Sequence, residues 1–372
     1  MGPLFANSGR KNGFHVETSV YRAVYESPEN NKIIKEWIPL KLMDCTLRDG
    51  GNVVGRGFDA ELTKMMIEGL IESGITTIEM GNCTGIGSYA ANNSIAPCTD
   101  LEYLELVQPY LSRAEIGMFL GYKNGSDENI GLAKQYGLNF LRVGANAGDG
   151  EQAADVVRRV KAHGLVCRYS LMKAYILTAE ELADEAAMLE KCGLDEITIM
   201  DSAGTMTPDQ VTAYVRTMVA KVTIPVAFHG HNNLGLSVAN ALAAQEAGAT
   251  VFDCGLLGMA RSAGNCATEL AAAAFQRRGL LMDVDLMKLL AFEDEKLIPA
   301  MEKHGYHVAV KPFDLILGLA GAHSSFTGMF KEVAEEKGVP LYPLILEVSK
   351  INRKNPDRAL VESVADGLAA GR

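Results

Sequence analysis

The feature that most constrains the fold of this chain is an alternation of short apolar runs and longer amphipathic stretches between Leu40 and Leu280. The short runs consist largely of β-branched or other apolar residues and have the length of buried strands. The longer stretches carry apolar residues at the spacing of one helix face. We predict eight strands from the short runs: Leu40–Asp44, Thr76–Met80, Glu115–Leu120, Phe140–Val143, Val166–Leu171, Glu196–Asp201, Val226–His229 and Val251–Cys254. Such an alternation is typical of a parallel sheet whose faces are covered by helices.

The stretches between these runs begin and end with the sequence signals of helices. Thr178-Ala-Glu-Glu181 and Thr207-Pro-Asp-Gln210 are typical helix starts, the second with proline in the first turn. Glycine follows several stretches at the position where helices end: Gly74, Gly164, Gly193 and Gly248. The predicted helices include Asp59–Ser73, Gly150–His163, Thr178–Cys192, Thr207–Ala220 and Leu236–Ala247. In the C-terminal part, the predicted helices are Asp283–Lys303, Pro312–Ala334, Leu341–Ile351 and Pro356–Ala369.

Eight strand–helix units can form either a closed barrel or an open, doubly wound sheet. An open dinucleotide-binding sheet would carry Gly-x-Gly-x-x-Gly after its first strand, whereas this chain has Asp49-Gly-Gly51 there. Polar residues also follow many of the strands, and only a closed barrel would bring all of them to one face. We therefore predict an α/β fold with a (β/α)8 TIM barrel at residues 39–282, an N-terminal extension at 1–38 and a helical C-terminal domain at 283–372.

The composition argues against nucleic acid and membranes as partners of this chain. The formal net charge of −11 argues against a basic face for nucleic acid or anionic membrane. No run approaches the ~20 apolar residues of a membrane span, and the first residues lack the apolar core of a secretion signal. The seven cysteines are scattered without a Cys-x-x-Cys pair, which is typical of reduced thiols. We expect a cytoplasmic protein with no nucleic-acid or membrane partner.

A His-Gly-His sequence ends the seventh predicted strand. Residues two apart on a strand point to the same face, so His229 and His231 place two imidazoles side by side. Asp49, in the turn after the first strand, adds a carboxylate if the fold brings it to the same point. Two neutral imidazoles and a carboxylate with open positions would form a divalent-metal site that can chelate and polarise a 2-oxo acid. The alternative is a solvated or hydrogen-bonded pair of histidines.

Four further side chains at strand ends are candidates for roles around this site. Arg48 could hydrogen-bond a developing enolate oxygen, or form an ordinary ion pair with Asp49. Asn265 could be a further metal ligand or a turn-forming residue. Asp201 could orient a metal-bound histidine or shape a turn. Glu79 could be a carboxylate of the pocket or the partner of an arginine. We count Arg48, Glu79 and Asp201 among the candidate substrate-binding residues.

Three motifs in this order resemble a known enzyme family. They are Asp44-Cys-Thr-Leu-Arg-Asp-Gly50, His229-Gly-His-Asn-Asn-Leu-Gly-Leu236 and Gly258-Met-Ala-Arg-Ser-Ala-Gly-Asn-Cys-Ala-Thr-Glu269. Together they resemble the DRE-type metal-dependent barrel lyases and synthases, which include isopropylmalate synthase, hydroxymethylglutaryl-CoA lyase and 4-hydroxy-2-oxovalerate aldolase. The resemblance covers roughly residues 40–275. It extends further for the aldolase branch, because Leu317-Gly-Leu-Ala-Gly-Ala-His-Ser-Ser-Phe326 is similar to the C-terminal helical region of that branch.

The resemblance implies roles for these residues. Asp49, His229 and His231 would be ligands of a divalent ion, with Mn²⁺ first and Mg²⁺, Co²⁺ or Zn²⁺ as alternatives. Arg48 would stabilise an enolate. In the aldolase branch, the C-terminal region forms an interface with an acylating aldehyde dehydrogenase, which the resemblance implies as a partner. Barrels of this family commonly form homodimers.

The sequence departs from the aldolase branch at three places, one of which is the C-terminal helix motif, where the branch has tyrosines and this chain has Leu319 and His323. The histidine base that follows the Arg-Asp-Gly turn in that branch is absent, and Asn52 is the nearest match. Asparagine cannot accept a proton at neutral pH, so His323 is the candidate replacement base, with a surface or packed histidine as the alternative. Lys173 stands where the branch tends to have small polar residues. It could bind an additional carboxylate or phosphate of an altered substrate, or be an ordinary loop lysine.

These residues lead to three hypotheses of function. The first is a metal-dependent aldolase that cleaves a 4-hydroxy-2-oxo acid through a pyruvate enolate, with an altered base and an acceptor other than acetaldehyde. The second is a Claisen-type condensing synthase that joins an acyl-CoA to a 2-oxo acid. The third is a catalytically silent, partner-binding subunit, which the missing base histidine favours and the retained ligands and Arg48 oppose.

Overall fold

Eight parallel strands form a closed barrel in sequence order, and β1 pairs with β8 to complete it. The computed structural model of the protein describes residues 40–91, 95–308, 312–320, 322, 326–352 and 355–370. The strands are β1 Lys41–Asp44, β2 Thr77–Met80, β3 Glu115–Gly121, β4 Phe140–Asn146, β5 Val166–Met172, β6 Glu196–Asp201, β7 Val226–Gly230 and β8 Val251–Cys254. The predicted (β/α)8 barrel is therefore confirmed, while the predicted extension at 1–38 lies outside the described residues.

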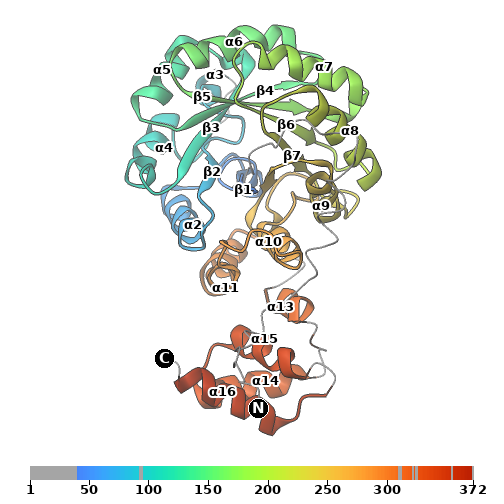
Figure 1. Ribbon diagram of the computed structural model, residues 1–372. Helices are drawn as coiled ribbons and strands as arrows, with labels where there is room; N and C mark the ends of the chain where they lie inside the picture. The colour runs from blue at the N-terminus through green and yellow to red at the C-terminus, as the bar shows by residue number, and fades with distance from the viewer. Residues whose placement is uncertain are drawn as a thin grey trace, which may run out of the picture.

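Helices surround this barrel, as Figure 1 shows. They are α2 Ala60–Glu72, α4 Asp100–Val107, α5 Asp127–Gln135, α6 Gly150–Ala162, α7 Ala179–Glu190, α8 Pro208–Lys221, α9 Ser237–Ala247 and α10 Thr268–Gln276, with the short α3 Ser88–Ala91 in the connection after β2. The start of α7 is a capping box in which Thr178 and Glu181 bond each other's backbone N–H groups. At the C-terminal end of α9, Gly248 has a φ of 112°, a conformation that residues with a side chain disfavour.

Strand pairing decides which side chains face the barrel interior. Arg142 on β4 lies opposite Phe119 on β3, and Asp253 on β8 lies opposite His229 on β7. Because paired residues on neighbouring parallel strands point to the same side, these side chains share the interior. Glycines make room for the large ones: a Cβ at Gly144 would lie only 2.0 Å from Cζ of Phe119. The interior is therefore filled by aromatic and charged side chains together.

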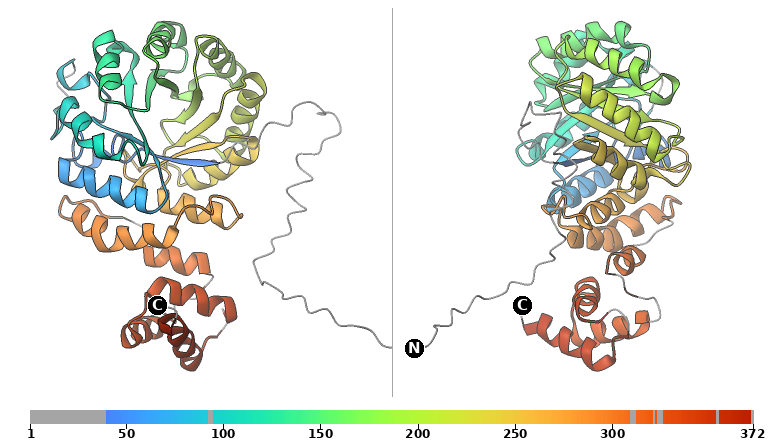
Figure 2. Two further views of the ribbon diagram at one scale, coloured as in Figure 1. Left: turned by 60° about the vertical axis from the view of Figure 1, so that its left-hand side comes forward. Right: turned by 45° about the vertical axis from the view of Figure 1, so that its right-hand side comes forward.

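The chain after α10 is helical. Its elements are α11 Leu286–Phe292, the π-helix η6 Glu293–Leu297, α12 Ile298–Glu302, α13 Pro312–Ala320, α14 Thr327–Lys337, α15 Leu341–Ile351 and α16 Arg358–Ala370. Helix α11 contacts α2 and α10 of the barrel, and α13 contacts α10 and α15. Helices α14, α15 and α16 contact one another, and Figure 2 shows them beyond one side of the barrel.

The C-terminal sequence predicts one helix over residues 312–334, and this is wrong. Two helices, α13 and α14, occupy this stretch. The sequence between them contains Gly321 and the Ser324-Ser325 pair, which favour turns over helix. Apolar residues on both sides of the break kept the helical pattern intact, so periodicity alone did not indicate it.

Two predictions from composition concern the chain as a whole. All seven cysteines are free thiols, and all but Cys192 are buried. Among the residues that the structure describes, no helix combines the length and apolar character needed to cross a membrane.

Candidate metal and active site

The three predicted metal ligands meet at the carboxyl end of the barrel. Oδ2 of Asp49 lies 3.7 Å from Nε2 of His229 and 3.8 Å from Nε2 of His231. The two imidazole rings lie 5.2 Å apart, edge to face. All three side chains are buried, and a ligand atom of each lies within 4.8 Å of the others. Ligand bonds of about 2.1 Å to one ion between them are compatible with these separations.

Local structure explains why Asp49 reaches this point. After β1, the backbone N–H groups of Arg48 and Asp49 both donate to the carbonyl of Cys45, which closes a tight turn. Gly51 is required next, because a Cβ there would lie 2.7 Å from the backbone of Gly57. The amide of Asn52 then donates to the carbonyl oxygen of Asp49 at 2.8 Å and lies 3.4 Å from its Oδ1. The turn and Asn52 together fix the carboxylate.

The second ligand segment is held by its neighbours on both sides. The N–H of His231 donates to the carbonyl of Asp201 on β6, and the N–H of Cys266 donates to the carbonyl of Gly230. A bridge between His231 and Asn265 brings the Asn265 side chain beside the ligands. Its Nδ2 donates to Oδ2 of Asp49 at 3.0 Å. Its Oδ1 is buried and has no hydrogen-bond partner among the described residues, so it is available as an oxygen ligand.

Electrostatics in this site suit a divalent cation. Burial raises the pKa of Asp49, but Arg48 and the two imidazoles outweigh it and hold that pKa well below its usual range. Burial, with His229 nearby, lowers the pKa of His231 to about 4. Near neutral pH the site therefore offers a carboxylate and a neutral imidazole, which are the forms that bind metals. Nδ1 of His231 is buried without a partner in the described part of the chain.

Arg48 lies at the edge of the three ligands. Its Nε donates to Oε2 of Glu79 at 2.6 Å, and its Nη1 lies 3.3 Å from Oδ1 of Asp49. The guanidinium packs over the ring of Phe119, 5.1 Å from its centroid. Nη2 is buried and has no hydrogen-bond partner among the described residues. Nη2 of the fixed, charged Arg48 guanidinium is therefore available to donate a hydrogen bond to a bound oxygen atom.

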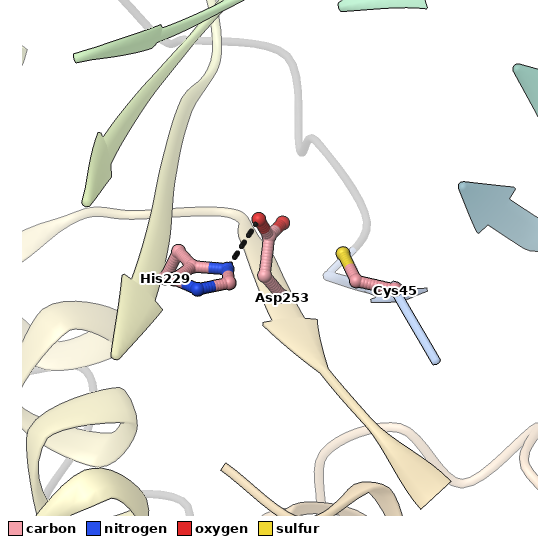
Figure 3. Close-up of side chains that lie close together, drawn as sticks. All are labelled: Cys45, His229 and Asp253. Atoms are coloured by element: carbon pink, nitrogen blue, oxygen red, sulfur yellow. Dashed lines mark hydrogen bonds and ion pairs between the residues drawn. The ribbon is translucent and has the colours of Figure 1, made fainter. Parts of the chain in front are cut away.

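A layer of charged side chains lies beneath the ligands. Nδ1 of His229 lies 3.0 Å from Oδ2 of Asp253, and Figure 3 shows this pair beside Cys45. Arg142 forms an ion pair with the same Asp253 oxygen and two hydrogen bonds with Glu79, each of 2.7 Å. A carboxylate on the second nitrogen of a metal-binding histidine fixes the ring and its tautomer.

Cys45, His229 and Asp253 also lie close enough together to suggest a second metal site. The charged neighbours argue otherwise, because Oδ2 of Asp253 is already shared by Arg142 and His229. Burial, followed by the charge of Asp253, raises the pKa of the Cys45 thiol well above its usual value. We therefore assign this group to the support of the Asp49 site.

The candidate carboxylates Glu79 and Asp201 already have hydrogen-bond partners within the protein. Both carboxylate oxygens of Glu79 are used by Arg48 and Arg142. Both oxygens of Asp201 accept backbone N–H groups, from Thr205 at 3.0 Å and Met206 at 2.9 Å. The carboxylate that pairs with the His229 ring is that of Asp253.

Two further candidates complete the set. Lys173 is exposed after β5, in a left-handed conformation with a φ of 56°, and its N–H donates to Oγ of Ser202. His323 lies outside the described residues.

Asp253, Arg142 and Phe119 support the site but are not among the residues that the sequence predicts for it. Asp253 stands in Val251-Phe-Asp-Cys254, an otherwise apolar strand, and a lone carboxylate there is itself a signal. A buried acid needs a partner, and inward-facing His229 on the preceding strand is the natural one.

The fold and the site together define a class, a barrel enzyme with a two-histidine, one-carboxylate centre at the carboxyl end of its strands. The family described as HMGL-like matches residues 148–295. The 4-hydroxy-2-oxovalerate aldolase 2 of Nocardia farcinica is 33% identical over 88% of this chain and 94% of its own length. The 4-hydroxy-2-oxovalerate aldolase of Carboxydothermus hydrogenoformans is 31% identical over 89% of this chain and 97% of its own.

Solved structures agree on the fold. The HMG-CoA lyase of Bacillus subtilis matches 73% of this chain and 96% of its own, with a TM-score of 0.61 and 19% identity. The hydroxymethylglutaryl-CoA lyase of Pseudomonas aeruginosa matches 77% of this chain and 99% of its own, with a TM-score of 0.61 and 16% identity.

The chain belongs to the family of the 4-hydroxy-2-oxovalerate aldolases. It is therefore an enzyme of the lyase class, as its motifs predict.

Proposed function

We propose that this enzyme is a divalent-metal-dependent aldolase that cleaves a 4-hydroxy-2-oxo acid into pyruvate and an aldehyde. The observation that carries the proposal is the convergence of Asp49, His229 and His231 beside Nη2 of Arg48, a buried donor without a partner among the described residues. When bound by these ligands, a divalent ion would polarise the 2-oxo group and stabilise negative charge on its oxygen. The names of the relatives support this substrate class.

The chain's own residues would support the proton transfer, the bond cleavage and the enolate that forms. A base removes the proton of the 4-hydroxyl group, the C3–C4 bond breaks, and the aldehyde leaves. The electron pair of that bond becomes the enolate of pyruvate, which takes up a proton at C3. Nη2 of Arg48 would donate to the enolate oxygen, while Glu79 fixes the other side of the guanidinium. Asn265 and Asn52 would keep Asp49 oriented throughout.

We assign the base to His323. Asn52, which occupies the corresponding place after the Arg-Asp-Gly turn, donates its amide to Asp49 and has no proton-accepting nitrogen. A titratable group from elsewhere is required, and an imidazole has a suitable pKa for a base near neutral pH. His323→Ala should lower kcat for cleavage by about 10²–10⁴-fold, as expected for loss of general-base catalysis. Full turnover of the true substrate by that variant would contradict the assignment.

We propose that the acceptor part of the substrate is polar. A cavity of about 270 Å³ lies at the carboxyl ends of β3, β4 and β5, and Lys123, Asn124, Asn146 and Asp149 are among its lining residues. Lys173 directly follows Met172, which also lines this cavity. A lysine held in a left-handed conformation is costly and is characteristic of functional sites. Lys173 would bind a carboxylate or phosphate on the aldehyde portion.

The preferred metal ion, the assembly, the partner and the location are proposed from the same family relationship. We propose Mn²⁺ as the preferred ion, a homodimer as the assembly, an acylating aldehyde dehydrogenase as the partner and the cytoplasm as the location. A cytoplasmic location is consistent with seven free thiols.

The function is tested by supplying Mn²⁺ to the metal-stripped protein and measuring pyruvate release from a panel of 4-hydroxy-2-oxo acids. We expect metal-dependent release of pyruvate and an aldehyde in equal amounts. Thiol release from acetyl-CoA with a 2-oxo acid, and no pyruvate release, would favour the condensing synthase instead. A protein that binds no metal and turns over no substrate would be the silent subunit, which contradicts the proposal.

A further inference from the structure

Arg142 is the largest side chain that lies fully buried within the described part of the chain. It enters the barrel interior from β4, beneath the candidate metal site. Its Nε and Nη2 each donate to one oxygen of Glu79 at 2.7 Å, and Nη1 pairs with Oδ2 of Asp253. Nη2 also lies 3.4 Å from Sγ of Cys45. One planar guanidinium therefore joins two carboxylates that come from β2 and β8.

Each of these carboxylates holds a different part of the site. Oε2 of Glu79 accepts from Nε of Arg48 at 2.6 Å, next to the unpartnered nitrogen that faces the substrate in the proposed reaction. Oδ2 of Asp253 lies 3.0 Å from Nδ1 of His229, a proposed metal ligand. The contacts therefore run without a gap through Arg48, Glu79, Arg142, Asp253 and His229. We call these five residues the buried charge chain.

We propose that Arg142 is a positioning residue that sets the distance and orientation between the metal ligand His229 and the enolate-binding Arg48. This inference rests on the proposed function, because it gives Arg48 and His229 the roles assigned there. Arg142 contacts neither of them directly and acts through Glu79 and Asp253. Its planar fork suits this role, since a guanidinium can hold two carboxylates at fixed angles while an ammonium group is a single point charge.

Replacing Arg142 by an uncharged residue should change the metal affinity in opposite directions if Arg142 positions the ligands or if it only balances charge. The buried charge chain and Asp49 together contain two cations, Arg48 and Arg142, and three anions, Glu79, Asp253 and Asp49, so their net charge is −1 with neutral imidazoles. Replacing Arg142 by an uncharged residue would make this −2. Coulomb attraction alone would then favour a divalent cation more strongly. Loss of positioning predicts the opposite, because removing an outer support of a metal ligand costs about 10–100-fold in metal affinity.

Arg168 offers a matched control inside the same barrel. It is also a buried arginine, on β5, and its contacts lie away from the site: Nη2 donates to Glu115 at 2.8 Å, and its guanidinium lies 3.9 Å from the ring centroid of Phe140. None of its hydrogen bonds or ion pairs is with a member of the buried charge chain. Arg168→Met therefore reports the general cost of removing a buried arginine from this barrel.

The experiment compares the wild type with Arg142→Met, Arg142→Lys and Arg168→Met. Co²⁺ is titrated into each metal-stripped protein and followed by visible absorption, and kcat and KM for pyruvate release are measured with saturating Mn²⁺. For both Arg142 variants we expect a Co²⁺ Kd at least about 10-fold higher than the wild type, an altered Co²⁺ spectrum and a lower kcat. For Arg168→Met we expect a Kd and a spectrum that match the wild type.

Two outcomes would overturn the inference. One is an unchanged or lower Kd in Arg142→Met with the wild-type spectrum, which would assign Arg142 to charge balance alone. The other is full recovery of Kd and kcat in Arg142→Lys, which would show that a point charge is sufficient. Should Arg142→Met fail to fold, Arg142→Lys carries the test. A wild type that binds no Co²⁺ and releases no pyruvate would refute the proposed function instead, so the two failures are distinguishable.

Discussion

Arg48 combines structural and chemical tasks in a single side chain. Two of its nitrogens are engaged, Nε by Glu79 at 2.6 Å and Nη1 by Asp49 at 3.3 Å, and the third, Nη2, is buried without a partner among the described residues. A buried donor without a partner is costly in a resting protein. Such a donor is useful where negative charge develops during the reaction, because it needs no rearrangement to bind that charge.

Arg48→Lys is the sharpest test of this role. Lysine keeps the positive charge but lacks the planar fork that bonds Glu79 through one nitrogen and leaves another for a substrate oxygen, so kcat for pyruvate release should fall by about 10²–10³-fold. KM should change much less, since the donor acts on charge that appears only in the transition state. Arg113→Lys, an exposed position near the start of β3, serves as the control and should behave as wild type. A kcat within twofold of wild type in Arg48→Lys would contradict the role.

Lys173 is a second single residue with a proposed task, which is to recognise one charged group of the substrate. Lys173→Ala should raise KM for 4-hydroxy-2-oxo acids that carry a second carboxylate or a phosphate by about 10-fold, and leave KM for uncharged acceptors unchanged. Steady-state pyruvate release from matched charged and uncharged substrates measures this difference. Equal KM changes for both kinds of substrate would remove the proposed specificity.

At the scale of the strands, a glycine on one strand makes room for a phenylalanine on its neighbour. Phe119 on β3 fills the space above Gly144 on β4, and Arg48 lies over the Phe119 ring at 5.1 Å. The position of this ring therefore contributes to the position of the guanidinium. The absence of a side chain on one strand is in this way connected to the chemistry at the end of another.

Gly144→Ala should displace the Phe119 ring, because the added Cβ would lie 2.0 Å from Cζ. We expect a loss of roughly 1–3 kcal/mol in the free energy of unfolding and a lower kcat. The double variant Gly144→Ala with Phe119→Leu relieves the clash and should recover most of the stability. Denaturant unfolding and pyruvate release measure the two effects. If the single variant retains full stability and full kcat, the ring does not depend on this glycine.

The junction between the barrel and the C-terminal helices contains buried acids outside the site. Burial raises the pKa of Glu269 on α10 to about 7. Burial, with the charge of Glu269 nearby, raises the pKa of Glu293 on the π-helix η6 well above its usual value. The folded state therefore holds more protons than the unfolded state between pH 4.5 and about 7. The contribution of these two acids to stability should be fully present below pH 4.5 and decline as the pH rises through this range.

Glu293→Gln keeps the shape of the protonated acid and removes its titration. The variant should be more stable than wild type at pH 8, by roughly 1 kcal/mol or more, and similar at pH 5. Thermal unfolding of the metal-free protein across this pH range measures the difference. A stability difference that is independent of pH would show that the pKa of Glu293 is the same in the folded and the unfolded protein, which contradicts the expected shift.

The sequence predicted those elements whose signals are local. Strand β6 and helix α15 coincide with their predicted ranges, since periodicity and flanking turns define them. Asp49, His229 and His231 could be found as well, because closing a barrel brings all carboxyl ends of the strands together. Their convergence is a consequence of topology, which the strand–helix alternation indicates.

The supports of the site could not be predicted in the same way. Arg142 and Glu79 are 63 positions apart in the chain, and Asp253 meets His229 only through the β7–β8 register. Which charged residues pair inside a barrel depends on register and on the room left by glycines, and a single sequence displays neither. Asp201 illustrates the limit, since its place at a strand end resembles that of Asp253, yet it bonds the backbone of its own loop.

At the scale of the whole molecule, the barrel unites residues from distant parts of the chain into one site. Asp49 and Asn265 are 216 positions apart and are joined by a 3.0 Å hydrogen bond. Because the site exists only in the folded barrel, metal binding should stabilise that fold. At a free metal concentration of about 100 times Kd, the expected gain in the free energy of unfolding is about 2.7 kcal/mol. Unfolding with and without added Mn²⁺ measures it, and an unchanged transition would contradict binding to the folded state.

We propose that one divalent ion is bound by Asp49, His229 and His231. The most direct measurement is a titration of the metal-stripped protein with Mn²⁺ by calorimetry, on the wild type and on Asp49→Asn, His229→Ala and His231→Ala, with His163→Ala as a surface histidine control. We predict one site per chain in the wild type and the control, and a Kd at least about 100-fold higher in each ligand variant, a change of about 2.7 kcal/mol. Wild-type affinity retained in any of the three ligand variants would contradict the claim.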